Sequence, residues 1–224
     1  MYIKGETKKK REARVREIMR RLDEHYGDHP MIFLQSETPW QLLFATILSA
    51  QCTDARVNMV TEQLFKKYRT LRDFADCDLK ELEEDIHSTG FYHNKARNIK
   101  ACAAVLCDQY NGILPDTIEE LTKLPGVGRK TGNLILGNIY HKDSIVVDTH
   151  VKRISNRLGL ADSADPEKTE YQLMESLPPE FWVRWNTHII ALGRSICTSQ
   201  SPKCSDCYLA DLCPSRDHDP ETWR

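Results

Sequence analysis

Four of the eight cysteines lie within seventeen residues near the C-terminal end of the chain. They follow the pattern C-x6-C-x2-C-x5-C at Cys197, Cys204, Cys207 and Cys213. Four thiolates at such short intervals suit a tetrahedral zinc ion or a 4Fe-4S cluster, and either would make the chain wrap around one small centre. Two disulfides in a secreted domain are the alternative, but the basic N-terminal segment does not resemble a secretion signal. The pattern therefore predicts a closed metal site and leaves the metal open.

Most of the remaining sequence repeats apolar residues at intervals of three and four, which is typical of amphipathic helices. Glycines and prolines separate these segments with short connections. One short apolar segment, Ser144 to Val147, suggests a strand. We therefore expect an all-α fold, with helices at Trp40 to Ser49, Val57 to Tyr68, Ala96 to Tyr110 and Trp182 to Ile196.

The charge of the chain is nearly balanced, with a formal net charge of −2. This value neither supports nor excludes a nucleic-acid partner, so any DNA contact must come from local basic patches and backbone amides. No apolar run is long enough to cross a bilayer, and we expect no membrane partner. Residues 1–21 are strongly basic, and we expect them to form a helix that packs against the C-terminal part of the chain.

A glycine-rich turn, Pro125-Gly126-Val127-Gly128, lies between two helical segments, the second of which begins near Arg129. Such a turn directs backbone amides outward, and the first turn of the second helix adds its own amides and the positive end of its dipole. Glycine permits a positive φ and a close approach of a phosphate to the backbone. The turn predicts an anion site, although an ordinary helix-to-helix connection would have the same composition.

Several motifs together make the chain resemble the endonuclease III family of helix-hairpin-helix DNA glycosylases. They are Leu48-Ser-Ala-Gln51-Cys-Thr-Asp54, Thr89-Gly-Phe91-Tyr, Leu124-Pro-Gly-Val-Gly-Arg-Lys130-Thr, Val147-Asp148-Thr-His150 and the cysteine run. The resemblance implies a two-lobed helix-hairpin-helix fold whose C-terminal loop holds a 4Fe-4S cluster rather than zinc. It implies a helical barrel domain with the hairpin at 32–142, and an iron-sulfur domain made of 1–31 and 143–224.

The resemblance assigns the chemistry to Lys130 and Asp148. Lys130 matches the nucleophile of the family, and its place in the first turn of a helix favours the neutral amine, as would partial burial. A solvated surface lysine is the alternative. Asp148 matches the essential carboxylate of the family, although a helix N-cap would explain the same residue. An N-cap for a helix starting near Ala55 also explains Asp54, which we do not count as catalytic.

The resemblance also implies the DNA contacts. Gln51 would fill the gap left by the extruded base and Phe91 would wedge between bases, with His150 beside them. The alternatives are a polar helix end for Gln51, a core aromatic for Phe91 and a histidine bonded to backbone for His150. Lys203 is the only charged residue between Cys197 and Cys204, where relatives hold several basic residues. The phosphate contacts are expected at Gly126, Val127, Gly128, Arg129, Arg194 and Lys203.

The implied function is that of a bifunctional DNA glycosylase and AP lyase. The expected partner is duplex DNA with damaged pyrimidines or abasic sites, and the expected state is a cytoplasmic, nucleoid-associated monomer. Two alternatives stay open. One is a monofunctional glycosylase specific for adenine or thymine mismatches, which would not need Lys130 as an amine. The other is a non-enzymatic DNA-binding protein stabilised by zinc.

Overall fold

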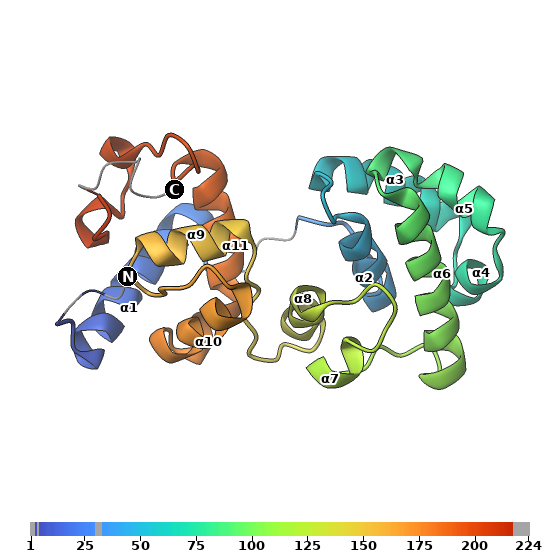
Figure 1. The fold of residues 1–224 in the computed structure, drawn as a ribbon, viewed down its shortest axis with the longest axis horizontal. Coiled ribbons are helices and arrows are strands. Elements are labelled where there is room, and N and C mark those ends of the chain that lie inside the picture. Colours follow the sequence, from blue (N-terminus) through green and yellow to red (C-terminus); the bar gives the residue numbers. More distant parts are fainter. Residues whose placement is uncertain (1–2, 4, 30–32, 217–224) are drawn as a thin grey trace. The chain divides into compact units, whose positions relative to one another are not determined.

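The structure, a computed structural model, describes residue 3, residues 5–29 and residues 33–216. These residues form eleven α-helices and four short 3-10 turns, with no β-strand among them (Figure 1). The all-α prediction is confirmed. The strand suggested at Ser144 to Val147 is wrong: the segment is buried and irregular, and the side chain of Asn186 donates to the Val146 carbonyl at 2.9 Å in place of a neighbouring strand. None of the described helices is long and apolar enough to span a membrane.

The chain divides into two compact units, and residues 32–142 form one of them. Its core is apolar, and Phe44 and Phe74 pack edge to face at its centre with ring centroids 5.1 Å apart. Pro39 opens the first helix of the unit, where Thr38 and Gln41 form a capping box. The elements are α2 (Pro39–Leu48), α3 (Asp54–Lys67), α4 (Leu71–Asp76), α5 (Leu79–Asp85), η1 (His87–Thr89), α6 (Tyr92–Gln109), α7 (Ile118–Leu121) and α8 (Arg129–Ile139).

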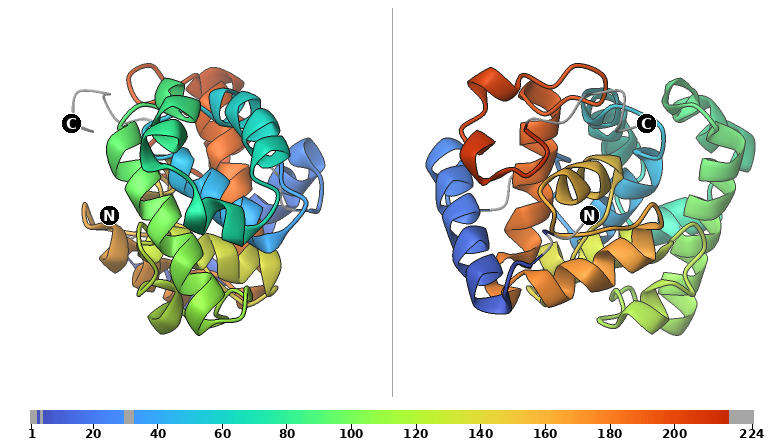
Figure 2. Two further views of the ribbon diagram at one scale, coloured as in Figure 1. Left: turned by 90° about the vertical axis from the view of Figure 1, so that its right-hand side faces the viewer. Right: turned by 60° about the vertical axis from the view of Figure 1, so that its left-hand side comes forward.

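The other unit combines residues 1–31 with 143–224. Helix α1 (Lys8–Tyr26) buries an apolar stripe of Val15, Ile18, Met19 and Leu22 in the core of this unit. It packs against α11 (Trp182–Ser195), and the two helices can be followed in Figure 2. The packing of the basic helix against the C-terminal part is thereby confirmed. The remaining elements are α9 (Thr149–Arg157), α10 (Pro166–Ser176), η2 (Pro179–Phe181), η3 (Cys204–Asp206) and η4 (Ala210–Leu212).

The arginines of α1 bind within their own unit. Arg14 donates to the Leu158 carbonyl at 2.7 Å and forms an ion pair with Glu6, while Arg21 donates to the Tyr208 carbonyl at 2.7 Å and pairs with Asp211. These bonds fasten α1 to the end of α9 and to the cysteine-containing loop. Arg14 and Arg21 therefore serve the fold of the unit.

Candidate catalytic and DNA-binding site

The glycine turn joins α7 to α8, as predicted. Gly126 has a φ of +79°, and a Cβ there would lie 2.8 Å from the Cβ of Asn98, so both backbone conformation and space require glycine. Gly128 differs, because its φ is −91° and a Cβ would meet nothing within 4 Å. Gly128 is the N-cap of α8 and has no side chain to cap it. Its position is exposed, so an external acceptor can approach the first-turn amides.

Lys130 is the second residue of α8, and its side chain is exposed. The partial burial expected for this amine is therefore not found in the protein alone. The opposite face of α8 is held in the core by Ile135 and Leu136. Helix α8 is thus anchored from behind while the lysine projects from its first turn, next to the glycine turn for which we predict an anion site.

Asp148 is the N-cap of α9, and one of its carboxylate oxygens accepts a hydrogen bond from the Val151 amide at 2.7 Å. The predicted cap is confirmed. The second carboxylate oxygen has no hydrogen-bond donor among the described residues. The cap thus holds the side chain in one orientation and leaves the second carboxylate oxygen available to accept a hydrogen bond or a proton. At Asp54 the predicted cap is wrong, because Thr53 caps α3 through a 3.3 Å bond from the Arg56 amide and Asp54 is the first helical residue.

Gln51 and Phe91 share an unusual backbone conformation. Their φ values are +55° and +50°, in the left-handed region that residues other than glycine seldom enter. Both side chains are exposed, and Phe91 shows 64% of its surface. The alternative of a core aromatic at Phe91 is therefore wrong. A large exposed aromatic on a strained turn is a common feature of binding sites.

Helix α9 carries His150 and two arginines that bind the cysteine loop. Arg153 donates to the Cys197 carbonyl at 2.9 Å and contacts the Nδ1 atom of His150 at 3.2 Å. Arg157 donates to the Cys197 sulfur at 3.2 Å and to the Thr198 carbonyl at 2.7 Å. Our sequence reasoning missed both arginines. Their spacing of four residues, one helical turn, was the available signal, but only the fold shows what they bind.

Arg194 and Lys203, the predicted phosphate contacts outside the hairpin, are both exposed. Arg194 is in the last turn of α11, and Lys203 directly precedes η3. The Lys203 amide donates to the Ile196 carbonyl at 3.0 Å, which closes the loop that begins at Cys197. Each residue thus flanks the cysteine loop at an exposed position.

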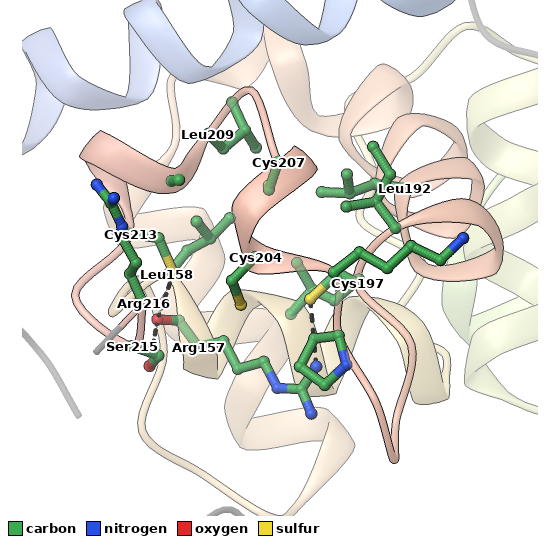
Figure 3. Close-up of a pocket in the computed structure, with 15 residues that line it drawn as sticks. Arg157, Leu158, Leu192, Cys197, Cys204, Cys207, Leu209, Cys213, Ser215 and Arg216 are labelled. Carbon is green, nitrogen blue, oxygen red and sulfur yellow. Dashed lines mark hydrogen bonds between the residues drawn. The ribbon is translucent and has the colours of Figure 1, made fainter. Parts of the chain in front are cut away.

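All four cysteines of the C-terminal run line one pocket, together with Arg157, as Figure 3 shows. Burial raises the pKa of Cys207, and that of Cys213 to about 11, so thiolates at these positions require a cation to compensate them. The pocket is also lined by apolar residues, and the guanidinium of Arg157 donates to the Cys197 sulfur. Four thiolates around one pocket are the donor set that a 4Fe-4S cluster takes, with each thiolate binding a different iron.

The sequence comparisons agree with this geometry. Residues 44–179 match the HhH-GPD superfamily of base excision DNA repair proteins, and residues 197–213 match the iron-sulfur binding domain of endonuclease III. Endonuclease III of Synechocystis sp. is 48% identical over 183 residues, which cover 81% of this chain and 84% of that protein. Endonuclease III of Bacillus subtilis is 43% identical over 186 residues, which cover 83% and 85%.

Two solved structures extend the similarity to the fold. A non-covalent endonuclease III–DNA complex has a TM-score of 0.85 at 43% identity and covers 94% of this chain and 97% of that chain. A trapped endonuclease III–DNA covalent intermediate has a TM-score of 0.86 at 42% identity and covers 98% and 100%. The hairpin, the cysteine pocket and these relatives lead to one conclusion: the chain belongs to the endonuclease III family of helix-hairpin-helix base excision repair enzymes, with a 4Fe-4S cluster as its cofactor.

Proposed function

We propose that this base excision repair glycosylase and AP lyase acts on damaged pyrimidines in duplex DNA, with Lys130 as its nucleophile. The observation that carries the proposal is the placement of Lys130, an exposed amine in the first turn of a helix whose N-cap is an exposed glycine. The amides of that turn suit a phosphate of the strand, so the amine would face the adjoining sugar. Positioning of this kind supplies a large part of the rate of a bimolecular attack.

In the proposed reaction, the neutral amine of Lys130 attacks C1′ of the damaged nucleotide. The bond from C1′ to the base breaks, the base leaves with its electron pair and takes up a proton, and the sugar ring opens to a protonated Schiff base with the lysine. Loss of a C2′ proton then expels the 3′ phosphate by β-elimination. Water hydrolyses the Schiff base, which restores the lysine and leaves a nick 3′ to the former abasic site.

Asp148 would accept the proton that the lysine loses and stabilise the positive charge that grows on the sugar. Its uncapped carboxylate oxygen supports this assignment, since the cap fixes the other oxygen. His150 would line the base pocket, and its Nδ1 contact with Arg153 gives the ring a defined orientation.

The proposed DNA contacts divide into two groups. Gln51 and Phe91 would enter the base stack, where the amide of Gln51 can both donate to and accept from an orphaned base. The second group would bind phosphates through backbone amides or side-chain charge. It comprises Gly126, Gly128, Arg129, Arg194 and Lys203. Val127 supports the turn instead, because its side chain is buried and its amide donates to the Leu124 carbonyl at 3.1 Å.

The cluster would be held by Cys197, Cys204, Cys207 and Cys213. When bound, it supplies a rigid centre that organises residues 197–213, and the proposed reaction has no step through it. We further propose that the protein acts as a monomer at the nucleoid in the cytoplasm. A single chain supplies every residue that the proposed reaction uses.

Borohydride trapping on abasic duplex DNA tests the nucleophile. The parent protein is expected to form a covalent complex that survives denaturation, and Lys130→Gln is expected to form none. Lys123→Gln is the matched control, since Lys123 belongs to the same hairpin and is paired with Glu120. Trapping by Lys130→Gln at the parental level would refute the assignment. Base release from adenine or thymine mismatches without trapping would favour a monofunctional glycosylase.

A further inference from the structure

Lys95 is a buried ammonium in α6, with 4% of its surface exposed. Its Nζ atom donates to the Leu48 carbonyl at 2.8 Å and to the Thr89 carbonyl at 2.8 Å. No carboxylate pairs with it among the described residues. A buried charge without a counter-ion is costly, and burial lowers the pKa of this lysine. Such a residue calls for an explanation beyond packing.

The two carbonyls that Lys95 binds belong to the ends of two different elements. Leu48 is the last residue of α2 and Thr89 is the last residue of η1. Carbonyls at helix ends lack intrahelical partners, and at the end of α2 the helix dipole also favours a cation. The Cys52 amide, which would meet the Leu48 carbonyl if α2 continued, bonds to Ser49 at 3.0 Å instead. Lys95 therefore serves as a shared C-terminal cap.

The turn that follows each carbonyl carries one of the two exposed left-handed residues. Gln51 follows Leu48 by three residues, and Phe91 follows Thr89 by two. Lys95 makes two bonds to the turn that contains Phe91. Its side chain donates to the Thr89 carbonyl, and its backbone amide donates to the Phe91 carbonyl at 3.2 Å. One side chain thus ties together two turns that are far apart in the sequence.

We propose that Lys95 is a positioning residue that sets the spacing between the Gln51 and Phe91 turns, so that both side chains enter the base stack together. This inference rests on the proposed function, in which these side chains insert into DNA. Each turn is a short irregular segment, and each would move independently without a common anchor. The ammonium has donors for both carbonyls at once, whereas a neutral side chain of similar length, such as methionine, has none.

Lys100 provides a matched control on the same helix. Its Nζ atom donates to the Ala75 carbonyl at 2.8 Å and to the Cys77 carbonyl at 2.6 Å, at the end of α4. It therefore has the same chemistry as Lys95, two carbonyls bound by one ammonium, without a bond to either the Gln51 or the Phe91 turn. Lys95→Met and Lys100→Met each remove one such cap.

The test compares these variants in two assays at saturating protein. The first measures base release from duplex DNA containing dihydrouracil. The second measures the fluorescence of 2-aminopurine placed opposite a stable abasic analogue, which rises when that base is unstacked. Lys95→Met is expected to release base about 10²-fold more slowly than the parent, as a displacement of about 1 Å can cause, with the fluorescence rise lost. Lys100→Met is expected to stay close to the parent in both assays.

Equal effects of the two substitutions would overturn the inference, because a purely structural cap would behave alike at both positions. If the parent itself neither released base nor raised the fluorescence, the proposed function would fail instead. Lys95→Arg covers the case in which Lys95→Met does not fold, because it keeps the charge but changes the reach. It is expected to lower the fluorescence rise per bound complex, and an unchanged rise would contradict the proposal.

A double-variant comparison adds an independent check. In a Gln51→Ala, Phe91→Ala background, the side chains that Lys95 would position are gone. Lys95→Met should then slow base release by less than it does in the parent, since residues that act together are not additive. A full additional loss would show that Lys95 acts by another route and would overturn the inference.

Discussion

The carboxylate of Asp148 caps α9 through one oxygen, so substitutions can separate the cap from the charge. Asp148→Asn keeps an oxygen acceptor for the Val151 amide, and asparagine caps helices about as well as aspartate. We expect thermal stability to change little while the trapping rate falls by about 10²-fold or more, the usual effect of losing a catalytic base. Thermal denaturation and borohydride trapping measure the two effects separately.

Asp148→Ala completes this comparison because it removes both the cap and the charge. It is expected to lower the free energy of unfolding by about 1 kcal/mol and to trap no better than Asp148→Asn. If Asp148→Asn trapped at the parental rate while Asp148→Ala was unstable, Asp148 would be a cap only.

His188 is a residue whose titration should affect the stability of its unit. It is fully buried, and its Nε2 atom lies 3.0 Å from Asp23, with Arg184 also bound to Asp23. Burial lowers the pKa of His188 below the ordinary 6.5. The unfolded chain therefore binds a proton more readily, and stability is lost as pH falls from 6.5 through the folded pKa. His188→Gln should flatten the dependence of Tm on pH below 6.5, and His141→Gln, at an exposed position, should not.

At the scale of elements, the α7–α8 hairpin contains two glycines with different tasks. Gly126→Ala must adopt a left-handed φ and meet Asn98, and the conformation alone should cost about 1–2 kcal/mol of stability. Gly128→Ala has ordinary φ and open space, so its stability should stay within about 0.5 kcal/mol of the parent. Its methyl group would instead obstruct the amides of the first turn of α8. We therefore expect weaker binding to abasic duplex DNA, measured by anisotropy, with an unchanged Tm.

The same hairpin shows why part of the fold could be predicted from sequence. Helices with a regular apolar period, such as α6 and α11, and the start of α8 after its glycine turn depend on local patterns. The bonds made by Lys95 and Arg157 join residues 47 and 40 positions apart, and no local pattern encodes such distances. The segment at Ser144 to Val147 has the β-branched, apolar composition that is typical of a strand. A strand also needs a partner strand, and the described residues supply none. A local rule also misplaced the cap at Asp54, since Thr53 was equally suited.

At the scale of the whole molecule, the cluster should stabilise the unit that contains it and leave the other unit intact. Cys204→Ser removes one proposed ligand and is expected to reduce the iron and sulfide content of the protein. The unfolding transition of residues 143–216 should also become less cooperative. Cys107→Ser is the control, because Cys107 belongs to the other unit. Hydrogen exchange should show lost protection in α9 and α11 while α6 stays protected. Full protection of α9 in a cluster-free protein would contradict this role.

The affinity for DNA as a function of salt depends on charges across the whole surface. Between Cys197 and Cys204 the only charged residue is Lys203, so this loop has little charge with which to neutralise phosphates. Each phosphate neutralised adds about 0.9 to the slope of log K against log salt. Ser199→Arg with Gln200→Arg should therefore steepen the slope by up to about 2 and tighten binding at low salt. Both residues are exposed, so the change should leave the fold intact.

Ser199→Asn with Gln200→Asn is the neutral control for the same two positions. It should reproduce the parental slope, because it changes side chains without adding charge. If the arginine variant kept the parental slope as well, the loop would not contact phosphates. Lys203 would then have no part in DNA binding, although the hairpin phosphate site and the lysine chemistry, which rest on α8, would stand unaffected.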